Sequence, residues 1–235
     1  GEIFPKLDPS DSQALDVGFA IGRQLLFFQE GMLINDTVDG VGVTRDTIIF
    51  PGIVDLRVTG FFGWDNIERE SSFQVEGGRL FGLFTEMDLR KSTVNLDAAY
   101  VTSDSNDDTS GDSLNIGVSS IQRFGLYNTA FRVNHSVAFD LQGRKTDDGT
   151  LLFAETSTTP AYSHDVAYFN TFLGLDNFSS AARDPIADGP LGRVGILFAG
   201  AGLGHYGAAL DNDPSDAFGG TVGYQKFFNK ERTQL

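Results

Sequence analysis

Cysteine is absent from the 235 residues, and lysine is scarce, with five among the 17 basic residues. The first absence excludes disulfide bonds and metal sites built from thiolates. The 17 Lys and Arg are outnumbered by 32 Asp and Glu, for a net charge of −15. Nucleic-acid binding needs a basic face, so we expect no nucleic-acid partner. A run of about 18 apolar residues is also lacking, which excludes a transmembrane helix but not a membrane-crossing β-strand of about 10 alternating residues.

What the sequence does contain is alternation of apolar and polar residues, the pattern of β-strands. In residues 92–102, Leu96 and Tyr100 fall on one face and Asp97 on the other. Only Arg90-Lys91 separates this run from the one before it, which predicts a hairpin with a tight turn. The other runs occupy residues 15–22, 41–50, 54–64, 81–89, 114–119, 131–139, 151–156, 166–175, 194–203 and 218–228. The sequence therefore predicts about ten or eleven strands.

Alternation alone leaves two all-β folds open, because a soluble sandwich buries its apolar face whereas a membrane barrel turns it to lipid. Several features favour the barrel. Many runs are long enough to cross a bilayer at a tilt. The turn at Arg90-Lys91 is short while the loop over 103–112 is long, and aromatic pairs such as Phe27-Phe28 and Phe61-Phe62 gather at run ends. The polar faces also lack the Lys that usually coats a soluble acidic protein.

We therefore predict one all-β domain over residues 1–235, an antiparallel up-and-down transmembrane β-barrel of about 10–12 strands or part of a larger barrel. Its expected location is the outer membrane of a Gram-negative bacterium, with membrane lipid as a partner. Residues 231–235 resemble a turn entering a new strand, which favours a domain incomplete at its C-terminus over a naturally short tail. An incomplete barrel would need another chain, a missing segment or a second copy to pair with its open edge.

One segment resembles a known family. Residues 21–34, Ile-Gly-Arg-Gln-Leu-Leu-Phe-Phe-Gln-Glu-Gly-Met-Leu-Ile, are similar to a strand-and-turn segment of alginate-export-type outer-membrane barrels, and residues 168–203 resemble a porin-like protein. The resemblance implies a porin-like barrel, although members of that family are larger. Their lumen is rich in Arg, whereas here the basic side chains are mixed with Asp and Glu. The resemblance therefore supports a barrel architecture but does not support a polyanionic substrate.

Opposite charges on one strand face are typical of a porin constriction, where they create a transverse field that selects ions by sign. Residues two apart on a strand project to the same side. The predicted pore-lining residues are Asp55, Arg57, Glu86, Asp88, Arg90, Asn95, Asp97, Arg132 and Asn134. The alternative is a ladder of salt bridges that fills a narrow barrel.

Residues 177–193 form the longest irregular stretch of the sequence. In larger porins one long loop folds inward and narrows the pore, and this stretch is our candidate for such a loop. The predicted constriction-loop residues are Arg183, Asp184, Asp188 and Arg193. The alternative is an ordinary external loop.

Oxygen-bearing side chains cluster in one acidic loop, and hard cations such as calcium prefer oxygen ligands. The candidate calcium ligands are Asp104, Asn106, Asp108 and Asp112, although their spacing departs from that of an EF-hand. A solvated acidic loop is the alternative, and no other cofactor is indicated. The three His residues lie far apart and no Gly-x-Ser-x-Gly motif occurs, so we expect no enzyme.

These features predict a porin-like outer-membrane channel. Ions or small polar solutes would diffuse passively through a lumen lined by Asp and Arg. The alternative function is that of a non-conducting structural or binding protein, a barrel or sandwich acting as a scaffold, adhesin or carbohydrate-binding module.

Overall fold

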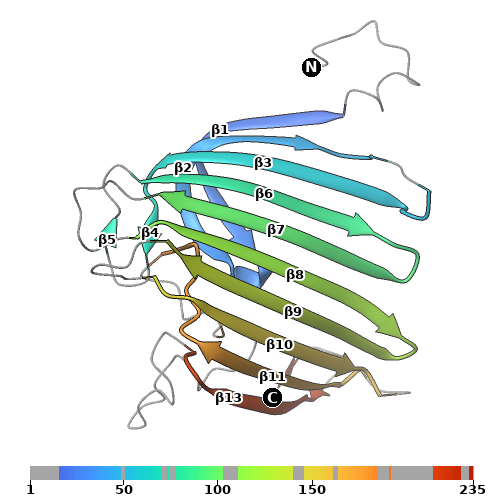
Figure 1. Cartoon of the computed structure of the whole chain (residues 1–235). Coiled ribbons are helices and arrows are strands. Elements are labelled where there is room, and N and C mark those ends of the chain that lie inside the picture. Colours follow the sequence, from blue (N-terminus) through green and yellow to red (C-terminus); the bar gives the residue numbers. More distant parts are fainter. Residues whose placement is uncertain are drawn as a thin grey trace, which may run out of the picture.

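The computed structural model describes residues 16–48, 51–69, 73–74, 78–102, 111–139, 146–160, 164–184, 191, 214–228 and 233–234. Ten long strands dominate this part of the chain (Figure 1). They are β1 (Val17–Phe28), β2 (Ile34–Arg45), β3 (Asp55–Asp65), β6 (Arg79–Asp88), β7 (Ser92–Thr102), β8 (Ser113–Phe124), β9 (Tyr127–Ala138), β10 (Gly149–Thr158), β11 (Val166–Asp176) and β13 (Phe218–Gln225). The shorter elements are η2 (Gln29–Gly31), β4 (Glu68–Arg69), β5 (Phe73–Gln74), β12 (Ala182–Arg183), β14 (Phe227–Phe228) and β15 (Thr233–Gln234).

The ten long strands follow one another in chain order, each antiparallel to the next. This confirms the predicted all-β, antiparallel up-and-down arrangement. The predicted closure into a barrel is not found. Closure requires hydrogen bonds between the two edge strands. In the described part of the chain β1 pairs only with β2 and β13 only with β11, so the sheet is open, with these two strands at its opposite edges (Figure 1).

The connections differ in length between the two ends of the sheet. At one end, residues 89–91 join β6 to β7 and residues 125–126 join β8 to β9, and the longer connections 46–54 and 159–165 lie at this end as well. At the other end, the chain passes through residues 66–78, 103–112 and 139–148 between successive long strands. The short turn expected at Arg90-Lys91 lies where it was predicted. The strand predicted over 194–203 lies outside the described residues.

The sheet has an inner face, which the tip of the β1–β2 hairpin covers, and an outer face on the opposite side. Register places apolar side chains of neighbouring strands side by side on the outer face. One such row runs through Leu96, Val118, Val133, Leu152, Leu173 and Phe218. From β3 to β13, the strand residues of this face include a single charged side chain, that of Arg79 at the first position of β6.

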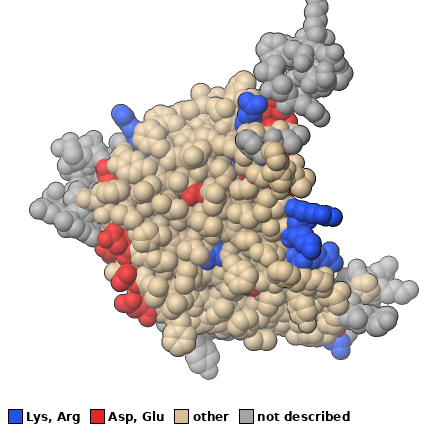
Figure 2. All heavy atoms as spheres, turned by 45° about the vertical axis from the view of Figure 1, so that its right-hand side comes forward, with Lys and Arg blue, Asp and Glu red and all other residues tan. Residues whose placement is uncertain are grey.

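The apolar residues of the outer face are exposed. Phe81, Leu83, Phe131 and Phe218 are among the large hydrophobic side chains that lie at the surface. Figure 2 accordingly shows a broad uncharged surface, with most of the Lys, Arg, Asp and Glu side chains near its margins. In a water-soluble sheet the exposed face is normally the polar one, so this arrangement is inverted.

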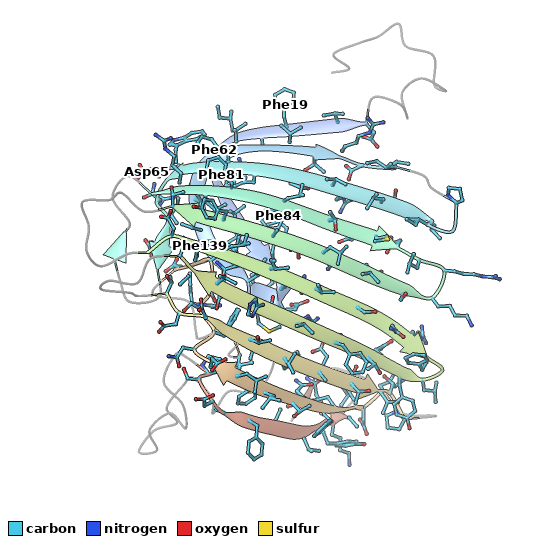
Figure 3. The ribbon with its side chains drawn as sticks, in the orientation of Figure 1. Phe19, Phe62, Asp65, Phe81, Phe84 and Phe139 are labelled. Atoms are coloured by element: carbon cyan, nitrogen blue, oxygen red, sulfur yellow. The ribbon has the colours of Figure 1, made fainter. Side chains whose placement is uncertain are left out.

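Aromatic rings gather near one end of the strands on the outer face. Phe62 lies 5.0 Å from Phe81 and 6.0 Å from Trp64, measured between ring centroids, and Tyr100 lies 6.1 Å from Phe139. Phe62, Phe81 and Phe139 lie toward the side of the long loops in Figure 3. Bands of this kind mark the level of the lipid headgroups in membrane proteins.

The β1–β2 hairpin leaves the sheet at a bulge and folds over the inner face. Only Asp39–Arg45 of β2 pair with β3, and the register shifts between Asp39 and Gly40. Gly40 fits this bend because a Cβ atom there would lie 2.4 Å from both the Phe61 ring and the Phe62 carbonyl oxygen. Its partner on β1 is Gly22, whose φ of +114° also favours glycine. The tip of the hairpin lies behind β6 to β8 in Figure 1.

Apolar side chains fill the space between the hairpin and the inner face. One cluster surrounds Leu33, Ile34, Phe61, Phe84 and Val101, and a second surrounds Met32, Leu151, Phe153, Phe172 and Phe178. β12 adds to this layer by pairing in parallel with Ile34 and Asn35 of β2, at the edge that β2 exposes after leaving β3. The inner face is therefore partly filled by the chain itself.

Candidate functional site

A polar hollow of about 350 Å³ lies on the inner face, between the hairpin tip and strands β3, β6, β7, β8 and β9. Its charged lining consists of Glu30, Arg57, Glu86, Asp97 and Arg132. The uncharged lining consists of Phe27, Phe28, Gln29, Thr59, Phe84, Thr85, Asn95, Ser119 and Ile121. We call this space the polar hollow.

The register of the sheet assembles the wall of the polar hollow from distant parts of the chain. Arg57 is paired with Glu86, Glu86 with Asn95, Asn95 with Ser119 and Ser119 with Arg132. This row crosses five strands. Asp97 lies in the adjacent row, because residues two apart on a strand share a face.

The hairpin tip closes the polar hollow from the other side and has an unusual backbone. Gln29 and Glu30 have φ values of 54° and 55°, in the left-handed region that costs a non-glycine residue about 1 kcal/mol. Both side chains reach across to the sheet. Gln29 Nε2 donates to Asp97 Oδ2 at 2.6 Å, and Glu30 Oε1 lies 3.5 Å from Arg132 Nη2. These contacts hold the strained tip against β7 and β9.

Each arginine of the polar hollow is shared by two carboxylates. Arg57 contacts Asp46 through Nε and lies 3.6 Å from Glu86 Oε1 through Nη1. Arg132 is 3% exposed, and its Nη1 is 3.0 Å from Glu155 Oε1 in addition to the contact with Glu30. The Arg132 guanidinium also lies 5.7 Å from the centre of the Phe153 ring. Since Arg132 is nearly buried, its two carboxylates offset a large desolvation cost.

Five of the nine predicted pore-lining residues line the polar hollow: Arg57, Glu86, Asn95, Asp97 and Arg132. Three more share the inner face but lie outside the polar hollow. Asp55 and Asp88 are register partners near one end of β3 and β6, and buried Asn134 donates through Nδ2 to Met32 Sδ at 3.8 Å.

Arg90 was expected on the same strand face as Asp88, and this placement is wrong. β6 ends at Asp88, and Arg90 lies exposed in the turn that follows. A tight hairpin needs residues outside the ladder to reverse the chain, and Arg90 with Lys91 supplies them.

Sequence reasoning missed Gln29 and Glu30, which belonged to a predicted turn, and the salt-bridge partners Asp46 and Glu155. No local signal indicates that residues 29 and 30 approach β7 and β9, because the approach depends on the bend of the whole hairpin.

Of the predicted constriction loop, residues 177–184 and Leu191 are described, and residues 178–183 are buried. Buried Arg183 donates to the Gly31 carbonyl oxygen and to Ser180 Oγ at 2.8 Å, and Ser180 Oγ donates to the Met32 carbonyl oxygen at 2.8 Å. Arg183 thus holds the hairpin tip and is not part of the lining of the polar hollow. Asp188 and Arg193 lie outside the described residues.

Asp184 continues the same pairing at the edge of the inner layer. Its backbone N–H donates to the Asn35 carbonyl oxygen at 2.9 Å. Burial and the negative charge of Asp184 together raise the pKa of nearby Glu68, while Arg23 lowers it. Asp184 therefore lies in an acidic neighbourhood near β4 and is not part of the lining of the polar hollow.

Of the candidate calcium ligands, Asp104, Asn106 and Asp108 lie outside the described residues. Asp112 is described, and its Oδ2 accepts a hydrogen bond from the Tyr100 hydroxyl at 3.0 Å. Among the residues that the structure covers, no three His, Cys, Asp or Glu side chains come together as metal ligands would.

No α-helix in the described ranges has the length and apolarity to cross a membrane. No protein-family model matches the chain, and neither the curated proteins nor the solved structures include a significant match. The resemblance to alginate-export-type barrels therefore stays a sequence-based prediction.

Proposed function

We propose that this chain forms the wall of a porin-like channel in the outer membrane of a Gram-negative bacterium, through which ions or small polar solutes diffuse passively. The observation that carries the proposal is the opposite character of the two sheet faces. The outer face from β3 to β13 is apolar and almost free of charge, while the inner face gathers Arg57, Glu86, Asp97 and Arg132 around a polar hollow. Membrane barrels distribute residues in this way.

The free energy of solvation favours lipid as the neighbour of the outer face. Apolar surface in water costs about 25 cal/mol per Å², and exposed patches larger than a few hundred Å² mark interaction sites. Strands of 10 to 12 residues, such as β6 and β8, also match the length needed to cross a bilayer at a tilt. A soluble sandwich would instead need a second layer over this whole face.

The two open edges of the sheet indicate that the channel needs further strands as partners. In lipid, unpaired backbone N–H and C=O groups are too costly to expose, so a membrane-spanning sheet must be closed. We propose that the free edges of β1 and β13 pair with further strands, from another chain, from a second copy or from chain outside the described residues. Lipid and the diffusing solute are the other proposed partners.

A second candidate, a non-conducting barrel with a structural or binding role, is favoured by the filling of the inner face. The hairpin tip and residues 177–184 pack two apolar clusters against the sheet. If this packing is permanent, the polar hollow has no continuation through the barrel and the protein conducts no ions.

Adjacent cysteine substitutions on β7 test the channel proposal in a chain that has no native cysteine. Asn95→Cys lies at the polar hollow and Leu96→Cys on the outer face. In planar bilayers, a charged methanethiosulfonate reagent is expected to lower the conductance of Asn95→Cys by about twofold, because charge at a constriction controls ion flux. The Leu96→Cys protein should keep its conductance, since its thiol faces lipid.

Three outcomes separate the candidates. Equal modification of both variants from the aqueous phase would contradict the membrane assignment of the outer face. Protein that stays in carbonate-washed membranes but carries no current would favour the non-conducting barrel. Protein that washes off as a soluble species would exclude both.

A further inference from the structure

We propose that the polar hollow binds small cations carrying N–H donors, the chemical class of primary ammonium ions. That such cations pass through the channel rests on the proposed function. That they bind in the polar hollow is supported by three observations: its charge balance, its unpaired acceptors and its aromatic wall.

The charge balance around the polar hollow is negative. Arg57 is shared by Asp46 and Glu86, and Arg132 by Glu30 and Glu155. Asp97 adds a further carboxylate, so the lining itself holds three carboxylates, those of Glu30, Glu86 and Asp97, against two guanidiniums. Asp46 and Glu155 lie outside the lining as additional partners of the two arginines. Both guanidiniums are already paired, which leaves neither free to attract an anion. A cation entering the polar hollow therefore meets a favourable field.

Asp97 is the carboxylate best placed to bind such a cation. Its Oδ2 accepts from Gln29 Nε2 at 2.6 Å and its Oδ1 from the Thr85 backbone N–H at 3.2 Å. Both partners are neutral, and none of the ion pairs found among the described residues includes Asp97. Carboxylate oxygens accept more than one hydrogen bond each, so Asp97 retains capacity for a charged donor.

Two amide oxygens at the polar hollow have no hydrogen-bond partner among the described residues. Gln29 is 5% exposed, and while its Nε2 binds Asp97, its Oε1 is buried and unpaired. The Oδ1 atom of Asn95, a residue of the facing wall, is unpaired in the same way. An unpaired buried acceptor is costly, and a rotation of either side-chain amide toward the polar hollow would let a ligand N–H group remove that cost. Both atoms are acceptors, so they favour a ligand that donates.

Three phenylalanine rings form another part of the wall. Phe28 and Phe84 stack with ring centroids 3.5 Å apart, and Phe27 lies beside them in the lining. Figure 3 places Phe84 about midway along β6. Aromatic faces attract cations and pack against alkyl groups. The combination of acceptors and rings favours an organic ammonium ion over a bare metal ion.

Saturation-transfer NMR on the folded full chain in detergent micelles measures this binding without requiring conductance. The probes are methylammonium, which has three N–H donors, and tetramethylammonium, which has the same charge and none. We expect binding of methylammonium and at least about tenfold weaker binding of tetramethylammonium, because charge-assisted hydrogen bonds are the strong ones. Asp97→Asn should lower methylammonium affinity by about tenfold.

A matched control removes the same charge elsewhere. Asp65→Asn lies on β3 near the long-loop side of the sheet (Figure 3), outside the polar hollow, and should bind methylammonium as the unmodified chain does. If Asp97→Asn fails to fold, Glu86→Gln provides a second test. The Glu86 side chain is half exposed, and its loss should weaken binding by about threefold.

Equal affinity for the two cations, preference for acetate, or equal losses in Asp97→Asn and Asp65→Asn would overturn the proposed site. The channel proposal is judged separately in bilayers. Conductance without methylammonium binding would overturn the site and leave the channel, whereas binding without conductance would leave the site and contradict the channel.

Discussion

Gly40→Val is expected to lower the free energy of unfolding by about 3 kcal/mol, the upper range for overpacking a crowded site. A Cβ atom at this position would lie 2.4 Å from the Phe61 ring and from the backbone oxygen of Phe62. The backbone oxygen has no rotamer with which to move away, so the β1–β2 hairpin must shift and its tip must leave β7 and β9. Urea titration followed by circular dichroism measures the loss.

The control for this prediction is Gly60→Val on the neighbouring strand β3. A Cβ atom at Gly60 would meet nothing within 4 Å, and valine is favoured in strands. We expect this variant to be as stable as the unmodified chain or slightly more so. Equal destabilisation by the two substitutions would mean that the tight bend at Gly40 does not hold the hairpin in place.

Val118→Arg has the second large expected effect, a loss of about 2–4 kcal/mol in lipid, the cost of arginine near the midplane on the lipid face of a barrel. Val118 lies in the middle of β8 on the outer face. The expected result is poor insertion into lipid vesicles, measured by flotation and by the mobility shift between boiled and unboiled samples.

Ile121→Arg is the matched comparison for Val118→Arg. Ile121 lies on the same strand with nearly the same exposure, 41% against 40%, but it lines the polar hollow. On the lumen side an arginine stays near water, so insertion should be close to normal. If both variants insert equally well, or if both are stable without lipid, the outer face is not a membrane surface.

The strands were predictable because alternation is a local property. The run over 92–102 coincides with β7, and the tight turn at Arg90-Lys91 fixes the pairing of Asp88 with Thr93. That register then aligns Glu86 with Asn95, which is why two predicted lining residues meet in the polar hollow. The end of β6 was placed too far along the chain, and this put Arg90 on a face that it does not reach.

The inward fold of the hairpin was not predictable, because its cause is a contact between residues far apart in the sequence. Phe61 and Phe62 crowd Gly40. Val38 crowds Gly63, because a Cβ atom added to Gly63 would lie 2.6 Å from Val38 Cγ1. The partners of these contacts lie too far apart in the sequence for a local pattern of residues to indicate them. The strand predicted over 41–50 instead covers Ile34–Arg45, because the polar residues Asn35 and Asp36 obscured the alternation at its start.

The attachment of the hairpin tip also determines the order of events during folding. The hairpin itself joins residues close in sequence and can form early. Its anchors on the sheet cannot, since Glu30 and Arg132 are 102 residues apart and Gly31 and Arg183 are 152 residues apart. Contacts of such long range form late, after the loops between them have closed. Docking of the tip must therefore follow the assembly of β9 and the arrival of Arg183, which makes it one of the last steps in reaching the native state.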